Sequence, residues 1–305
     1  MPKNNEKFKI KFRGTRGSYP VARRNFLEFG GNTACVEVWC DKQLIILDAG
    51  GGIIDIGLNE IKKIPKFSFK PHLATILLSH IHQDHIQGLQ FYKPLFVKKS
   101  KIRLFGPALK EETLKETLKK ILFDKVFPLG LEEIRSDFEI NNFSSDNVIV
   151  ISQNGNTKIY TKSDFNKKNI KDDIIITCFK SNSHPKNGCL CIKIEYDSKS
   201  LVYATDIEAG FDINYEFIDF IKNCDVLIHD AQYTSDDYTN LKNPKKGFGH
   251  STFEMAIDTQ RKTGAKELYF FHYDPEYDDS KLSNLEKILA NKNIHFAKEN
   301  DEIII

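Results

Sequence analysis

Short apolar runs, separated by turns rich in glycine, asparagine and lysine, recur along the whole chain. Residues 8–12 alternate apolar and basic side chains, which is typical of a half-buried strand. Consecutive apolar residues predict buried strands, and apolar residues spaced three or four apart predict amphipathic helices. The predicted strands are 8–12, 35–39, 44–47, 74–79, 102–105, 148–151, 174–176, 190–196, 200–204, 225–229, 267–271 and 301–305. The predicted helices are 58–64, 90–94, 109–123, 215–222, 253–263 and 280–290.

Strands that cluster at the start of each half, with helices after them, predict a mixed α and β fold. No linker, low-complexity tract or short repeat divides the 305 residues, so we expect a single domain over residues 1–305. The 40% apolar and 28% charged content is typical of a soluble globular protein. The net charge of +2 argues neither for a broad nucleic-acid-binding surface nor against a local basic patch.

The chain shows no signal for export or membrane insertion. Its first seven residues have no apolar core, and no apolar stretch approaches the roughly 20 residues that span a bilayer. The six cysteines have neither zinc-ribbon nor redox spacing. We therefore expect a cytoplasmic protein with reduced thiols, although a thiolate ligand to a metal stays open.

Most of the chemical information lies in one short segment that follows the predicted strand 74–79. It carries His80, His82, Asp84 and His85 in the pattern His-x-His-x-Asp-His. Imidazole and carboxylate groups are preferred ligands of zinc and similar divalent metals, and a loop that leaves a strand lets them converge. The alternative is three histidines that are satisfied separately on a surface loop, and the rest of the chain argues against it.

Further candidate ligands follow in order along the chain. The pattern resembles the metallo-β-lactamase superfamily, whose remaining ligands match His184, Asp206 and His272. The resemblance covers nearly the whole chain and implies a four-layer αββα sandwich. It implies one metal held by His80, His82 and His184, a second held by Asp84, His85 and His272, and Asp206 bridging the two.

The resemblance also assigns supporting roles. Two neighbouring cations can activate a water near neutral pH, and Asp84 would orient that water and accept its proton. Asp48, at the end of the predicted strand 44–47, resembles the aspartate that fixes a ligand imidazole through its other nitrogen. The alternative for Asp48 is a turn residue before Gly50.

Two segments resemble the tRNA-processing endoribonuclease RNase Z. One contains His229 and Asp230 before Ala-Gln, and the other is Gly-His-Ser-Thr around His250. The resemblance implies that His250 is the general acid for the leaving oxygen and that Asp230 orients it. His250 as a residue that only precedes a helix stays open. His229 is either a support for the site or a satisfied core histidine.

Three basic residues are candidates for binding substrate. Lys245 and Lys246 lie just before the segment of His250, where a basic loop can attract phosphate. Arg16 lies in Gly-Thr-Arg-Gly-Ser, which resembles a loop of the phosphodiesterase and RNase Z branch. A solvated lysine run, and an arginine paired with a carboxylate, are the alternatives.

We therefore predict a phosphodiesterase that uses two divalent metal ions, with zinc, manganese and iron all compatible. RNase Z enzymes carry a long arm between their third histidine and the bridging aspartate, whereas His184 and Asp206 leave room only for a strand pair. We thus expect a small substrate, a cyclic nucleotide such as cyclic AMP or cyclic GMP. The alternatives are an RNase Z-like or other nucleic-acid phosphodiesterase, and a metal-binding module without hydrolytic activity. A homodimer stays open.

Overall fold

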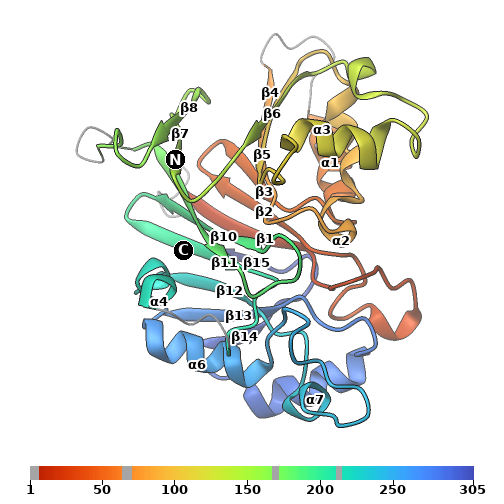
Figure 1. Ribbon diagram of the computed structural model, residues 1–305, viewed down its shortest axis with the longest axis vertical. Helices are drawn as coiled ribbons and strands as arrows, with labels where there is room; N and C mark the ends of the chain where they lie inside the picture. Colours follow the sequence, from red (N-terminus) through yellow and green to blue (C-terminus); the bar gives the residue numbers. More distant parts are fainter. Residues whose placement is uncertain (1–6, 64–70, 167–171, 211–214) are drawn as a thin grey trace.

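The computed structural model describes residues 7–63, 71–166, 172–210 and 215–305, which contain two mixed β-sheets that pack face to face (Figure 1). The first sheet has the order β15 (Glu302–Ile304), β1 (Phe8–Gly14), β2 (Cys35–Cys40), β3 (Gln43–Leu47), β4 (His72–Leu77), β5 (Ser100–Gly106) and β6 (Asp137–Asn142). The second has the order β14 (Ile294–Phe296), β13 (Glu267–Phe271), β12 (Val226–Asp230), β11 (Lys199–Ala204), β10 (Cys189–Tyr196), β9 (Ile174–Ser181), β7 (Asn147–Ile151) and β8 (Thr157–Thr161).

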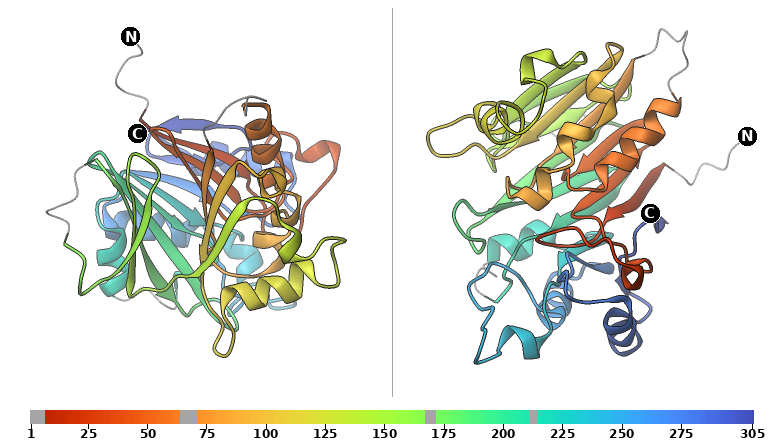
Figure 2. Two further views of the ribbon diagram at one scale, coloured as in Figure 1. Left: turned by 90° about the horizontal axis from the view of Figure 1, so that it is seen from above. Right: turned by 90° about the vertical axis from the view of Figure 1, so that its right-hand side faces the viewer.

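Helices cover the outer face of each sheet. The α-helices are α1 (Ile53–Lys63), α2 (Gln83–Ile86), α3 (Leu114–Leu118), α4 (Tyr215–Ile221), α5 (Ser235–Tyr238), α6 (Phe253–Thr263) and α7 (Asp279–Leu289). Short 3₁₀ turns are η1 (Arg24–Phe26), η2 (Leu89–Phe91), η3 (Lys93–Phe96) and η5 (Leu131–Glu133), and η4 (Lys119–Phe123) is a π-helical turn. The segment with α3 and η4 lies outside the first sheet, away from the second (Figure 2).

Three apolar clusters separate the layers. Side chains of successive strand residues point to opposite faces, so Ile45 joins the cluster between the sheets and Ile46 the cluster beneath α1 and α3. In the second sheet Ile228 points inward, whereas Leu227 packs under α4, α6 and α7. The predicted four-layer αββα sandwich is therefore confirmed. Among the described residues, no helix has the length and apolar character needed to cross a membrane.

The parallel strands set the position of the site. Strands β3 to β6 are parallel in the first sheet, and β11 to β14 are parallel in the second. The carboxyl ends of parallel strands lie at one edge of a sheet, where the following loops converge. The predicted ligand segments follow β4, β11 and β13 at these edges.

Three strands were not predicted from the sequence. Strands β6 and β8 have mostly polar, partly exposed side chains, so their apolar signal is weak. Strand β14 is only three residues long and pairs with β13 through Ile294 to Phe296.

The helix predictions were wrong at several boundaries. Helix α1 begins at Ile53, directly after the glycine run, and not at residue 58; the predicted end at Ile64 lies outside the described residues. The predicted helix 90–94 is instead a pair of 3₁₀ turns, the second with Pro94 near its start. Helix α3 begins only after Thr113, whose side chain accepts from the backbone N–H of Glu116 in a capping box.

Candidate metal centre

The structure brings the seven predicted metal ligands together where the two sheets meet. His80 and His82 lie on the loop after β4, and Asp84 and His85 lie in the short helix α2 that follows. The other three follow β9, β11 and β13: His184, Asp206 and His272. Six of the seven side chains are buried and His82 is half-buried.

Asp206 lies between two groups of histidines. Its Oδ1 is 3.6 Å from Nε2 of His80 and 3.7 Å from Nε2 of His184. Its Oδ2 is 3.1 Å from Nε2 of His85 and 3.3 Å from Nε2 of His272. One carboxylate thus presents one oxygen to each group, which is the arrangement that a bridging ligand requires.

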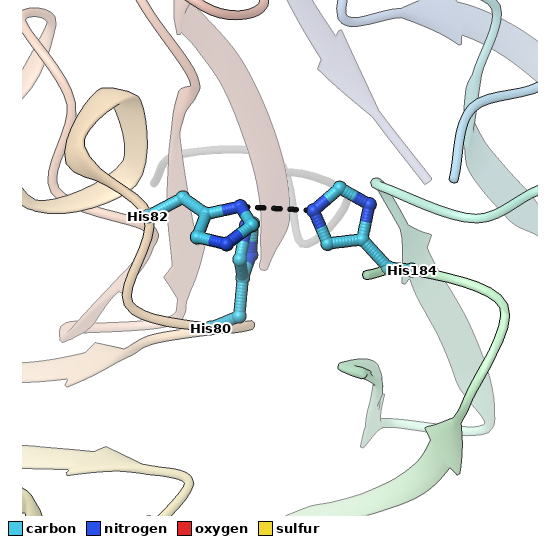
Figure 3. A group of neighbouring side chains, drawn as sticks. All are labelled: His80, His82 and His184. Carbon is cyan, nitrogen blue, oxygen red and sulfur yellow. Dashed lines mark hydrogen bonds between the residues drawn. The ribbon is translucent and has the colours of Figure 1, made fainter. Parts of the chain in front are cut away.

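Each group of side chains can hold a metal ion. The imidazoles of His80, His82 and His184 point toward one another, with Nδ1 of His82 2.9 Å from Nε2 of His184 (Figure 3). Their ligand atoms lie within 4.8 Å of one another, as do those of the second group, Asp84, His85 and His272. The buried Nε2 of His80 has no hydrogen-bond partner, so this nitrogen is available as a ligand.

Asp48 holds the tautomers of two of these histidines. Its Oδ2 lies 2.7 Å from Nδ1 of His85, and since a carboxylate only accepts, the hydrogen is on Nδ1. The hydroxyls of Ser79 and Tyr203 donate to the same Oδ2 at 2.8 Å. Because Ser79 Oγ donates to Asp48, it accepts from Nδ1 of His80 at 3.1 Å. With Nδ1 of each histidine engaged in these bonds, Nε2 faces the cluster and is the nitrogen that can bind a metal.

Two further histidines of the cluster are fixed in the same way by amide oxygens. Nδ1 of His184 lies 3.2 Å from the carbonyl oxygen of Gly249, and Nδ1 of His272 lies 3.2 Å from Oε1 of Gln232. Both oxygens accept, so each Nδ1 carries the hydrogen and each Nε2 has a free lone pair. This orientation of the outer nitrogen is what a metal-ligating histidine needs.

The electrostatics also suit a divalent cation. Burial holds the pKa of His80 well below its usual range and lowers that of His184 to about 4, so both imidazoles are in the neutral form that binds metal. Burial opposes a charge on His85, but Asp206, Asp84 and Asp48 outweigh it and raise its pKa. Three carboxylates around one imidazole create a negative potential that attracts a cation to this point.

His250 and Asp230 form a pair beside the cluster. Nδ1 of His250 lies 2.7 Å from Oδ2 of Asp230, whose Oδ1 accepts from the backbone N–H of Ser251. Burial opposes protonation of His250, but the charge of Asp230 and its hydrogen bond outweigh burial and raise the pKa to about 9. A protonated imidazole that a buried carboxylate orients can donate a proton near neutral pH.

Comparison with known proteins places this geometry in a family. A model described as the beta-lactamase superfamily domain matches residues 45–273. The chain belongs to the metallo-β-lactamase superfamily. Ribonuclease Z of Picrophilus torridus is 28% identical to it over 298 residues, which cover 90% of this chain and 88% of that protein. Ribonuclease Z of Methanocaldococcus jannaschii is 26% identical, in an alignment that covers 97% of this chain and 94% of that protein.

Solved structures agree on the fold. The metallo-β-lactamase fold protein YhfI from Bacillus subtilis has a TM-score of 0.65 at 19% identity, over 98% of this chain and all of that one. The short form of human tRNase Z has a TM-score of 0.60 at 15% identity, over 97% and 98%. This member of the superfamily is a metal-dependent hydrolase.

Arg16 does not fit the predicted contact with substrate. Its side chain is fully buried, and its guanidinium donates to the carbonyl oxygens of Gly30, Asp274 and Tyr277. The guanidinium also lies 4.9 Å from the centre of the Phe26 ring. Arg16 therefore ties its own loop to the segment that follows His272, and solvent does not reach its side chain.

His229 likewise does not support the cluster. Strand β12 alternates, so Ile228 and Asp230 face the inner side, whereas His229 lies on the outer side with Leu227. Its Nδ1 lies 2.7 Å from the carbonyl oxygen of Asp230, and burial lowers its pKa. Of the two interpretations from the sequence, the core position fits, but the histidine is only partly satisfied because its buried Nε2 has no hydrogen-bond partner.

The two lysines occupy different surroundings. Lys245 is half-buried, with its ammonium 5.6 Å from the centre of the Tyr233 ring and 5.7 Å from that of Phe248. Tyr233 in turn lies 6.0 Å from His250, centre to centre, so Lys245 lies near the predicted acid. Lys246 is exposed.

Several supporting residues were not predicted from the sequence. Tyr203 and Gln232 contact Asp48 and His272, and Glu208 accepts from the backbone N–H groups of Gly247 and Gly249. The sequence did indicate a buried hydrogen bond from Tyr203, because a tyrosine in a buried strand needs a partner for its hydroxyl.

Proposed function

We propose that the protein is an RNase Z-like endoribonuclease that removes 3′ extensions from tRNA precursors. The observation that carries the proposal is the buried pair of His250 and Asp230 beside the histidine cluster. The similarity to proteins named Ribonuclease Z over 88% and 94% of their lengths supports the same substrate class.

We propose that the site binds two divalent ions. His80, His82 and His184 would hold one ion, Asp84, His85 and His272 the other, and Asp206 would bridge them. Bound there, the ions would supply an activated water and neutralise charge on the phosphate. Zinc suits this nitrogen and oxygen set, and manganese and iron are compatible with it.

The residues of the chain would position the groups that move protons. Oδ2 of Asp84 accepts from the backbone N–H of Ser18 at 2.8 Å and lies 3.3 Å from Nε2 of His272. Held in this way, Asp84 would orient the attacking water and accept its proton. His250 would give its proton to the leaving ribose oxygen, with Asp230 stabilising the imidazolium. Each such role contributes about 10²–10⁴-fold to the rate.

A specific observation favours a small phosphodiester as the second candidate. Strands β10 and β11 pair directly, from Ile192 with Tyr203 to Tyr196 with Lys199, in a tight hairpin between His184 and Asp206. The hairpin leaves no place there for a long tRNA-gripping arm. Cyclic AMP and cyclic GMP need no such arm.

One assay distinguishes the endoribonuclease from the small-substrate phosphodiesterase. Protein loaded with zinc or manganese is incubated with a 3′-extended tRNA precursor, cyclic AMP and cyclic GMP, with Asp84→Ala as the blank. Trimmed tRNA with intact cyclic nucleotides supports the endoribonuclease. Linear nucleotide from the cyclic substrates with intact precursor would overturn it in favour of the small-substrate enzyme.

A further inference from the structure

The loop that leads into His250 is held in one conformation by a buried carboxylate. Glu208, with 1% of its surface exposed, accepts from the backbone N–H of Gly247 at 2.8 Å and of Gly249 at 3.0 Å. The hydroxyl of Tyr238 donates to the same carboxylate. Both glycines have positive φ, 86° and 87°, which other residues adopt only with strain. The side chain between them is therefore presented at a fixed position.

That side chain is an aromatic ring in contact with solvent. Phe248 is 49% exposed, whereas Gly249 and His250 directly after it are buried. A ring that contributed only to the core would be covered, since its apolar surface stabilises the fold mainly when buried. The hydrogen bonds to Glu208 and the two glycines therefore hold the apolar ring of Phe248 in solvent beside His250.

Phe248 is linked to the acid by a short series of contacts. The ammonium of Lys245 lies near two rings, 5.7 Å from the centre of Phe248 and 5.6 Å from that of Tyr233. Tyr233 lies edge-on to His250 with ring centres 6.0 Å apart. A nucleoside whose oxygen reaches His250 is therefore within range of both Lys245 and Phe248.

We propose that Phe248 is a stacking platform for the base of the leaving nucleoside, with Lys245 beside it to attract the adjoining phosphate. The proposal rests on the proposed function. The water oxygen bonds to phosphorus, the bond from phosphorus to a ribose oxygen breaks, and that oxygen takes the proton of His250. The leaving nucleoside consequently lies on the side of His250, where Phe248 is. Every base has a π-face, so the platform accepts any base.

The test removes the base and the ring separately. Two RNA oligonucleotides are compared, one normal and one with an abasic ribose in the leaving nucleoside, which is identified from the product ends. Stacking on one aromatic ring predicts a loss of about 5- to 150-fold in kcat/KM for the wild type when the base is absent. Phe248→Ala should cleave both oligonucleotides with the low kcat/KM that the wild type shows for the abasic one. Phe248→Tyr should again cleave the normal oligonucleotide faster than the abasic one. Leu241→Ala, at a position 99% exposed in the same loop, is the surface control.

The outcomes distinguish this proposal from the proposed function. Equal base dependence in the wild type and in Phe248→Ala, both with full metal content, overturns the platform. If the wild type leaves RNA intact, the endoribonuclease proposal fails, and the same variants are then compared on cyclic AMP and its abasic analogue. Base dependence that disappears in Phe248→Ala supports the platform on either substrate.

Discussion

Replacing Asp48 by asparagine tests how the ligand histidines are oriented. The Asp48 carboxylate is fully buried and accepts four hydrogen bonds: from the backbone N–H and hydroxyl of Ser79, from His85 and from Tyr203. Oδ1 takes one of these bonds and Oδ2 takes three. An amide has a single accepting oxygen, so Asp48→Asn must bring an NH₂ group against at least one donor.

Both orientations of the amide are costly. With NH₂ in place of Oδ1, the backbone N–H of Ser79 loses its partner, which costs about 1–3 kcal/mol for a buried donor. With NH₂ in place of Oδ2, His85 can avoid the clash only by moving its hydrogen from Nδ1 to Nε2. That atom faces Asp84 and Asp206, so this tautomer cannot bind metal there. We expect metal affinity to fall about 10- to 100-fold, as for other partners of ligand histidines.

The measurements are zinc affinity, from competition with a chromophoric chelator, and urea unfolding of the apoprotein. Tyr203→Phe is the matched control, because it removes one donor to Asp48 and leaves the bond from His85 in place. It should lower stability by about 1.5–3 kcal/mol, the range for bonds to charged groups, with nearly unchanged zinc affinity. Zinc affinity in Asp48→Asn equal to that of Tyr203→Phe would refute the tautomer argument.

Further predictions concern the acid, its loop and the metal. His250 has a pKa raised to about 9, so its acid form is lost as pH rises through that value; His250→Gln should remove the fall in kcat/KM there, in a pH–rate profile. A Cβ at Gly249 would lie 2.4 Å from Nδ1 of His184, so Gly249→Ala should release one metal ion, measured by metal analysis. Glu208→Gln, which keeps one acceptor for the loop, should lower kcat less than Glu208→Ala in steady-state kinetics. Removing the metal with a chelator should lower Tm, because a ligand at 1,000 times its Kd adds about 4 kcal/mol to the free energy of unfolding.

One segment of the metal cluster could be predicted directly from the sequence because its residues are local. His80 to His85 form a continuous motif, and Asp206 and His272 each follow an apolar strand whose period is visible. Parallel strands end at one edge of a sheet, which brings such segments together, but the choice of these residues as ligands came from the resemblance to the superfamily. The apolar periodicity predicted only a mixed α and β fold, and the four layers came from the resemblance. The polar strands β6 and β8 were not predicted.

The supporting contacts could not be predicted because they join distant parts of the chain. Asp48 and Tyr203 meet only because the two sheets pack face to face. Arg16 lies in a glycine-rich loop that reads as exposed, yet the segment around Tyr277 covers it. The start of α3, in contrast, could have been predicted from the sequence, because Thr113 and Glu116 have the spacing of a capping box.

In the proposed function the cluster itself does not select the substrate, because its groups would act on phosphate, metal and water, which all phosphodiesters share. Asp48, Asp206 and His272 each have positive φ, between 53° and 66°, a costly conformation that the packed sheets beneath them sustain. Such a rigid base serves tRNA and cyclic nucleotides equally well. The rim differs: the tight β10–β11 hairpin offers no arm, and the loop held by Glu208 presents Phe248 to solvent. If the proposed function holds, substrate selection comes from the rim, where the exposed ring of Phe248 would recognise a base in either proposed substrate.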